Sequence, residues 1–231
     1  MDKYNNYLEY ALGAGEQSKQ KVIQFRKNYS SFLPKDKNAN ILDIGPGKGE
    51  LLSYLASKNY VNIEAVDISK SVVDYIQKLN FKCTLTADLV EFLGDKKGRY
   101  SVITMCDVVE HIPKDKILLI VSSIYNSLEE GGILIIQVPN MQSIVANIFM
   151  YDDFTHEAGY TERSLTQMLK MCGFSSIHCY GFEFLGNGVK AKIHRFSRSI
   201  FWFFIKIYRN INGTMPHKIL HPVFFSIAKK C

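Results

Sequence analysis

The chain has 231 residues, of which 47% are hydrophobic and 22% charged, and its formal net charge is +6. This composition is typical of one globular α/β domain, with or without an appendage, and it excludes a disordered or fibrous chain. No segment reaches the roughly 20 consecutive apolar residues that a membrane-spanning helix needs. The first ten residues lack the apolar stretch of a secretory signal, so we expect a cytoplasmic protein.

The five cysteines include no Cys-x-x-Cys pair, and their number is odd. Such a pattern is typical of reduced thiols in a cytosolic protein, not of a disulfide framework or a zinc site. We therefore expect no bound metal and no cysteine nucleophile.

The positive charge is concentrated at the end of the chain. From Phe184 to Cys231 there are nine cations and no acid, whereas the other 183 residues carry 19 cations and 22 acids. An acid-free basic segment indicates an anionic partner, which could be a lipid surface, a phosphate-bearing substrate or a nucleic acid.

Hydrophobic periodicity predicts an alternation of strands and helices along most of the chain. A helix is expected over residues 5–30, interrupted near Gly13 and Gly15. The predicted strands are 41–44, 63–66, 81–85, 100–105, 133–138 and 174–182, and the predicted helices between them are 51–55, 72–79, 117–128 and 161–171. Nearly continuous apolar strands in such an alternation indicate a parallel sheet covered on both faces.

The basic end of the chain has a different pattern. Residues 192–211 are predicted to form an amphipathic helix, because apolar residues recur at steps of three and four while cations lie between them. Its middle is apolar almost all round. Residues 223–228 are predicted to form a last strand.

A glycine-rich turn carries the strongest chemical signal. The strand 41–44 is followed by Gly45, Gly47 and Gly49 and then by a helix. Glycines allow a ligand to approach the backbone closely, and a helix N-terminus offers amide donors. The dinucleotide fingerprint requires a sixth-position glycine, where this chain has Glu50.

Three aspartates follow three successive strands. Asp43 precedes the glycine turn, and a carboxylate there suits an ammonium-bearing ligand better than a pyrophosphate. Asp67 can accept hydrogen bonds from ribose hydroxyls, and Asp88 can accept one from an exocyclic amine. Since parallel strands end at one edge of a sheet, all three acids are expected to face the same crevice.

Five segments between about residues 40 and 140 resemble, in the correct order, the motifs of class I S-adenosylmethionine-dependent methyltransferases. They are the glycine turn with Asp43, the pair Asp67-Ile68, Ala87-Asp88-Leu89, Met105 to Ile112, and Glu130-Gly131-Gly132. The resemblance implies S-adenosylmethionine as cofactor. It implies that Asp67 binds the ribose, Ile68 lies against the adenine, Asp88 and Leu89 meet the adenine amine, and Cys106 borders the methionine part.

The same resemblance implies the architecture. We expect a seven-stranded Rossmann-like sheet with helices on both faces, an antiparallel last strand, and the amphipathic helix inserted before that strand. The expected units are an N-terminal helical cap (1–34), the cofactor-binding core (35–188), and the basic insertion with the final strand (189–231).

Methyl transfer to oxygen usually needs a general base, and two histidines are candidates. His156 lies in a polar loop, residues 151–157, and we predict that it is the base. His111 follows the fourth strand and serves either as a second candidate or as part of the cofactor wall. Asp107 is a third candidate, either supporting the catalytic groups or capping a helix, and Glu110 is either functional or solvent-facing.

The acceptor is suggested by a further resemblance. Asp153-Phe154-Thr155-His156, the following helix and Gly173-Phe174 resemble methyltransferases encoded with bacterial surface-polysaccharide genes. This implies O-methylation of a sugar, with a lipid-linked glycan as one form of acceptor, at the inner face of the membrane. Two alternatives remain. The acceptor is a lipophilic small molecule such as a prenylated phenol, or the protein is a non-catalytic scaffold that binds the cofactor.

The basic helix leaves two interpretations open. Residues 190–211 suit an anionic membrane surface, with cations at the headgroups and aromatic rings below them. They also suit ordinary core or the face of a homodimer. A nucleic-acid acceptor is disfavoured, because Cys106 to Val109 stands where such enzymes carry an Asn/Asp-Pro-Pro-Tyr-like motif.

Overall fold

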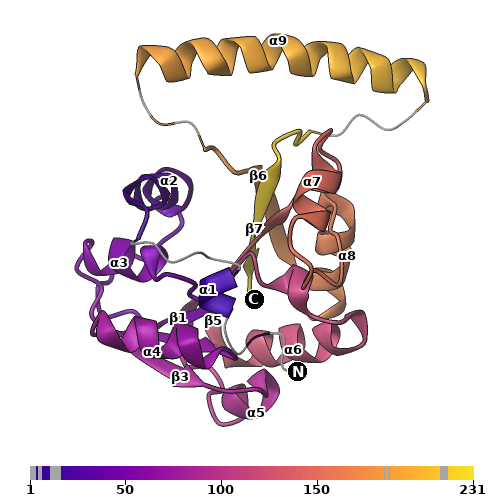
Figure 1. The fold of residues 1–231 in the computed structure, drawn as a ribbon. Helices are drawn as coiled ribbons and strands as arrows, with labels where there is room; N and C mark the ends of the chain where they lie inside the picture. Colours follow the sequence, from indigo (N-terminus) through magenta and orange to yellow (C-terminus); the bar gives the residue numbers. More distant parts are fainter. Residues whose placement is uncertain (1–3, 5–6, 11–16, 185, 187, 214–217) are drawn as a thin grey trace.

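The computed structural model describes residues 4, 7–10, 17–184, 186, 188–213 and 218–231 (Figure 1). The strands are β1 (Ile41–Ile44), β2 (Ile63–Asp67), β3 (Lys82–Leu85), β4 (Tyr100–Cys106), β5 (Leu128–Pro139), β6 (Ser176–Gly181) and β7 (Val223–Lys229). The helices are α1 (Tyr7–Tyr10), α2 (Lys19–Tyr29), α3 (Glu50–Ala56), α4 (Lys70–Lys78), α5 (Leu89–Leu93), η1 (Val109–His111), α6 (Lys114–Ser127), α7 (Ala146–Tyr151), α8 (Glu162–Met171) and α9 (Val189–Ile211).

All seven strands form one sheet in the order β3-β2-β1-β4-β5-β7-β6. The pairs from β3 to β5 are parallel, and β7 runs antiparallel to both β5 and β6. The strand order reverses direction between β1 and β4, the position at which open α/β sheets bind ligands. The predicted seven-stranded Rossmann-like sheet with an antiparallel last strand is confirmed.

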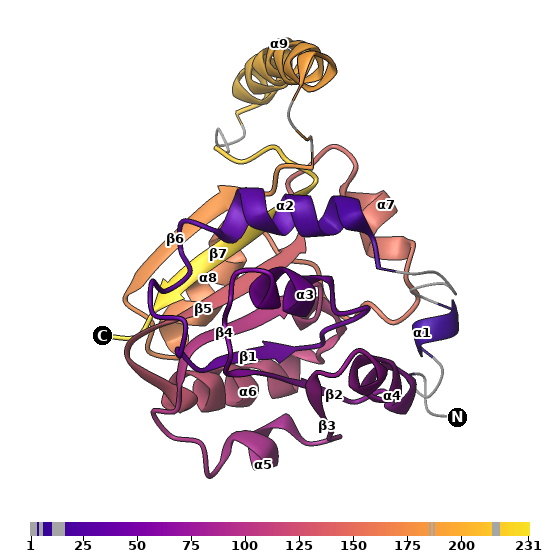
Figure 2. The same ribbon diagram turned by 90° about the vertical axis from the view of Figure 1, so that its left-hand side faces the viewer.

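Helices cover both faces of the sheet, which explains its nearly continuous apolar strands. Side chains of α5, α6 and α8 join one hydrophobic cluster, and side chains of α2, α3 and α4 join the clusters on the opposite face. Figure 2 shows α2 and α3 in front of the sheet and α6 behind it. The parallel strands are therefore rigid supports for the residues at their carboxyl ends.

The structure corrects three expectations about element boundaries. The predicted helix over residues 5–30 is present as α1 and α2, and residues 11–16 between them lie outside the described residues. Strand β5 begins at Leu128, so Gly131 and Gly132 lie within the strand and not in a turn before it. They do so because their backbones pair with that of Lys230. The N–H of Gly131 donates to the carbonyl of Lys230, and the N–H of Lys230 donates to the carbonyl of Gly132. The short helices α5, η1 and α7 were not predicted.

Helix α9 lies apart from the sheet and its covering helices (Figure 1). None of its residues is buried. Arg198 donates to both carboxylate oxygens of Glu183, and the ring of Trp202 meets the ring of His221 at a centroid distance of 4.5 Å. Among the described residues, no helix combines the length and the apolar character that crossing a bilayer requires.

Candidate functional site

The glycine turn after β1 has a backbone that only glycine adopts easily. Gly45 has φ +70°, and a Cβ placed there would lie 2.4 Å from Cγ2 of Val108. Gly49 has φ +73° and precedes α3. Residues other than glycine are strained at such positive φ values. The turn is thus packed closely against the segment after β4.

Asp43 is almost completely buried at the end of β1. The hydroxyl of Thr104, its neighbour on β4, donates a hydrogen bond of 2.6 Å to Oδ1 of Asp43. Burial raises the pKa of Asp43 to about 7, and the negative charge of Asp67 adds to the effect. A buried carboxylate of this kind is favourable for a ligand that brings a positive charge.

Asp67 lies at the end of β2, the neighbour of β1. Its Oδ1 accepts a hydrogen bond of 2.7 Å from the backbone N–H of Ser69. Burial raises its pKa to about 6. The next side chain, Ile68, is exposed by 42%, and exposure leaves an apolar surface available beside the carboxylate. This arrangement fits a ribose on Asp67 with a base against Ile68.

Asp88 and Leu89 have clear local roles. The exposed Asp88 caps α5, because its Oδ1 accepts from the backbone N–H groups of Val90 and Glu91. Leu89 is half-buried against the core. Helix capping therefore accounts for Asp88 without a ligand, and its predicted contact with the adenine amine stays a prediction.

Cys106, at the end of β4, is half-buried, with its Sγ 3.6 Å from the hydroxyl of Tyr29. Burial raises the pKa of the thiol well above its ordinary value, so the group is neutral and a poor nucleophile. This agrees with a role in lining the crevice.

Asp107 follows β4 with φ +56°, an unusual conformation for a residue other than glycine. Its Oδ2 accepts a hydrogen bond of 2.9 Å from Nε2 of Gln137, and the hydroxyl of Tyr29 donates to Oε1 of Gln137 at 2.6 Å. These bonds connect the turn after β4 to β5 and α2. They hold Asp107 at the carboxyl edge of the sheet, and its support of the catalytic groups stays a prediction.

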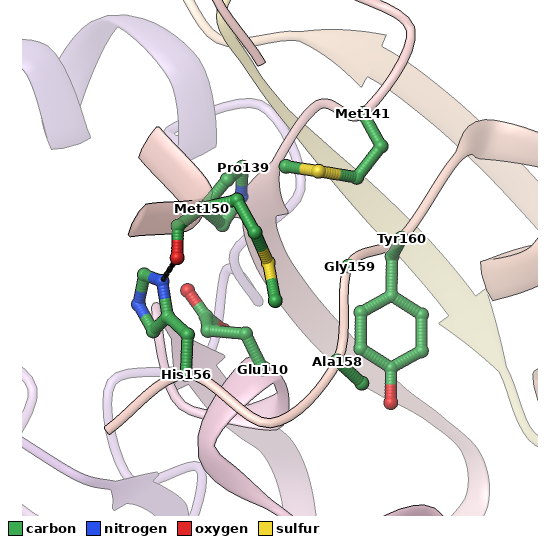
Figure 3. Close-up of a pocket in the computed structure, with 8 residues that line it drawn as sticks. All are labelled: Glu110, Pro139, Met141, Met150, His156, Ala158, Gly159 and Tyr160. Atoms are coloured by element: carbon green, nitrogen blue, oxygen red, sulfur yellow. Dashed lines mark hydrogen bonds between the residues drawn. The ribbon is translucent and has the colours of Figure 1, made fainter. Parts of the chain in front are cut away.

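The two candidate histidines lie together. The rings of His111 and His156 have centroids 4.7 Å apart. Nδ1 of His156 lies 3.2 Å from the carbonyl oxygen of Met150, which makes it the donor (Figure 3). Glu110 joins them: one ligand atom from each of these three residues lies within 4.8 Å of the other two. The structure thus unites residues that are 45 positions apart in the sequence.

A hydrogen-bonded chain supports His111 from the loop that contains His156. The hydroxyl of Thr155 lies 2.8 Å from Nδ1 of His111 and 2.6 Å from Oδ1 of Asp153. The hydroxyl of Tyr7 donates to Oδ2 of Asp153 at 2.9 Å. Burial alone would raise the pKa of Asp153, but these hydrogen bonds hold it below its ordinary value.

The sequence left Glu110 either functional or solvent-facing, and the solvent-facing alternative is wrong because the side chain is buried. Its side chain is 2% exposed, and neither carboxylate oxygen has a hydrogen-bond partner among the described residues. Burial, and the nearby charge of Asp107, raise its pKa well above the ordinary value. Its backbone carbonyl accepts from the N–H groups of Glu157 and Ala158, which ties the two segments of the cluster together. Alternation of apolar and polar residues does not reveal such a position.

Residues 16–179, more than two thirds of the chain, match the family described as "Methyltransferase domain". The chain therefore belongs to the methyltransferase-domain family. No curated protein sequence matches the chain.

Solved structures share the fold over nearly the whole chain. A SAM-dependent methyltransferase from Archaeoglobus fulgidus is 21% identical, with a TM-score of 0.68, over 99% of this chain and 100% of that one. A SAM-dependent methyltransferase from Thermotoga maritima is 13% identical, with a TM-score of 0.63, over 91% and 89%. Phosphoethanolamine N-methyltransferase 2 of Haemonchus contortus, in complex with S-adenosyl-L-methionine, is 15% identical, with a TM-score of 0.64, over 100% and 60%.

The chain is thus a methyltransferase-domain protein with the fold of solved S-adenosylmethionine-dependent methyltransferases. The residues fit S-adenosylmethionine: Asp43 offers a buried carboxylate to a cationic ligand, Asp67 offers acceptors for ribose hydroxyls, and the glycine turn with its positive φ values leads into the N-terminus of α3. The parts played by the individual residues stay predictions.

Proposed function

We propose that the enzyme methylates a hydroxyl oxygen of a sugar during the synthesis of a cell-surface glycan. The observation that carries the proposal is the hydrogen bond between Thr155 and His111. It joins Asp153 to His156, the segment that resembles methyltransferases encoded with surface-polysaccharide genes, to the segment after β4, which the family resemblance predicts to border the cofactor. This contact supports placing the loop at the active site.

The chemistry of the cluster supports an oxygen nucleophile. When bound, S-adenosylmethionine supplies an electrophilic methyl group on a sulfonium, and the protein mainly has to position the acceptor. A sugar hydroxyl is a weak nucleophile, and it gains reactivity when a nearby group accepts its proton or stabilises its anion. We place this hydroxyl beside Glu110, His111 and His156. His156 is the first candidate for the proton acceptor, because its Nδ1 is engaged with Met150 and a neutral ring then has its lone pair on Nε2.

The test is methyl transfer with labelled cofactor to a panel of nucleotide sugars and lipid-linked glycans, with mass spectrometry to locate the methyl group. We expect an O-methyl sugar, and a His156→Ala variant at least about a hundredfold slower. The matched control is His178→Ala, since His178 is an exposed histidine on β6. Methylation of nitrogen or carbon acceptors alone, or turnover of His156→Ala within about tenfold of the parent, would contradict the proposal.

We further propose that α9 binds an anionic membrane surface. The exposed apolar side chains of this helix are Val189, Ile193, Phe196, Ile200, Phe201, Phe203, Phe204, Ile207, Tyr208 and Ile211. Arg198 and Arg209 point to the body of the protein, where they meet Glu183 and the carbonyl of Gln142. Lys190, Lys192 and Lys206 remain for lipid headgroups, and no acid of the helix opposes them.

The position of α9 agrees with an acceptor held at a membrane. The helix connects β6 to β7, and it leaves and re-enters the sheet where Gly181 and Val223 lie. Val223 pairs with Pro139, the last residue of β5. Helix α9 is therefore attached at the carboxyl ends of the parallel strands, where we propose the active site. A lipid-linked acceptor would reach the crevice from this side.

Flotation with vesicles tests the membrane proposal. We expect binding to phosphatidylglycerol vesicles that decreases with salt and weakens in Phe203→Ser/Phe204→Ser, while Leu119→Ser, an exposed leucine of α6, binds as the parent does. Equal flotation of the parent and the α9 variant would contradict it. A stable dimer in solution that the α9 substitutions dissociate, without vesicle binding by the parent, would assign the helix to a homodimer instead.

A further inference from the structure

The cluster of Glu110, His111 and His156 has a feature that base catalysis does not explain. General base catalysis by a histidine requires no buried carboxylate without partners. Burial of an ionised carboxylate without hydrogen bonds or a counter-charge is costly, and proteins normally pair such groups or use them to coordinate metals. Glu110 is 2% exposed, and within the described part of the chain its carboxylate has no hydrogen-bond partner.

We propose that Glu110, His111 and His156 bind a divalent transition-metal ion. Their ligand atoms lie within 4.8 Å of one another. Two imidazole nitrogens and one carboxylate oxygen are a donor set that suits zinc, manganese, iron or cobalt better than magnesium or calcium, which prefer oxygen alone. Metal–ligand distances of about 2.0–2.2 Å would draw the three side chains together by small rotations.

The surroundings of the three residues favour metal binding. Thr155 holds the ring of His111 from one nitrogen, and the carbonyl of Met150 holds the ring of His156 in the same way. Metal-ligating histidines usually have their second nitrogen hydrogen-bonded, because this fixes the ring and the tautomer. The carbonyl of Glu110 accepts two backbone N–H groups from residues 157 and 158, so its backbone is also fixed.

Three protein ligands leave coordination positions open. The next step rests on the proposed function. Oxygen atoms of the acceptor, such as two neighbouring sugar hydroxyls, occupy the open coordination positions of the ion. A coordinated hydroxyl has a lowered pKa, so it can release its proton to solvent, and the histidines then act as ligands instead of as proton acceptors. The ion undergoes no change of oxidation state. The sequence-based expectation of no metal rested on cysteine spacing, which says nothing of this cluster.

Metal binding is measured on the full chain, freed of metal with a chelator, in the absence of cofactor and acceptor. Zinc and manganese are titrated by calorimetry, and cobalt by its visible absorption. We expect one ion per chain, and at least tenfold weaker binding by Glu110→Gln and by His156→Ala. His178→Ala is the matched control and should bind as the parent does. Circular dichroism verifies that each variant is folded. If His156→Ala does not fold, His156→Gln is used in its place.

The results separate this proposal from the proposed function. Equal affinity of the parent, Glu110→Gln and His156→Ala, or no binding by the parent, would overturn the metal site, whatever the acceptor. Metal binding at these residues without any O-methyl sugar product would leave the metal site standing and refute the sugar acceptor. Sugar methylation that survives full chelation, by a protein that binds no ion, would refute the metal site alone.

Discussion

The hydroxyl of Thr155 lies 2.8 Å from Nδ1 of His111, across 44 positions of sequence. The same hydroxyl donates to Oδ1 of Asp153 at 2.6 Å, because a carboxylate can only accept. Thr155 has one proton to donate, so towards His111 it is the acceptor, and Nδ1 of His111 carries a proton. A neutral ring then has its lone pair on Nε2. The loop that contains His156 therefore sets the tautomer of the other histidine.

This contact predicts that Thr155 positions His111 without touching the substrate. We expect Thr155→Val to lower methyl transfer about 10–100-fold, because losing a partner that orients a functional histidine typically has an effect of this size. Thr155→Ser should restore most of the rate, and the Kd for S-adenosylmethionine should stay unchanged in both. Steady-state kinetics and calorimetry measure these quantities. Thr166→Val, a half-buried threonine in α8, is the control, and a rate for Thr155→Val within twofold of the parent would refute the role.

Cofactor binding should depend on pH through Asp43. Burial raises the pKa of Asp43 to about 7, so the carboxylate that would face a cationic ligand is lost as the pH falls through neutrality. From pH 8 to pH 6 the ionised fraction falls about tenfold, and we expect the affinity for S-adenosylmethionine to fall by about the same factor. Asp67, with a pKa of about 6, adds to the loss at the lower end.

Calorimetry at several pH values measures this dependence. Asp43→Asn should bind more weakly and nearly independently of pH between 7 and 8, where Asp67 stays ionised. Parallel pH profiles for the parent and Asp43→Asn would show that another group is responsible.

The same carboxyl predicts how stability depends on pH in the protein without cofactor. The folded-state pKa of Asp43 is raised above the value of 3.8 expected for the unfolded chain, so the folded state holds more protons between these values. The free energy of unfolding should therefore decrease as the pH rises from about 4 to about 7. Asp43→Asn should show a smaller decrease in urea unfolding over this range, and Asp115→Asn, an exposed acid of α6, should show the parent's decrease. Identical slopes for the parent and Asp43→Asn would contradict the assignment.

Sequence patterns predict the parts of the site that lie at strand ends. Asp43 and Asp67 follow apolar strands, and the parallel sheet places such positions at one edge, so periodicity was sufficient. The burial of Glu110 could not be predicted, because η1 contacts residues 157 and 158, which are distant in the sequence. Likewise Gly131 resembles a turn residue, but pairing with Lys230 makes it part of β5.

The close packing of the glycine turn predicts a large effect of one methyl group. Gly45→Ala should lower the free energy of unfolding by about 1–3 kcal/mol for its positive φ alone, and by more because the new Cβ would meet Val108 at 2.4 Å. Gly98→Ala is the matched control, since Gly98 has φ +61° but nothing within 4 Å of an added Cβ. The difference between the two variants in urea unfolding therefore isolates the clash. Val108→Ala in the Gly45→Ala background should remove most of that difference, whereas equal losses for Gly45→Ala and Gly98→Ala would show that the turn yields to the methyl group.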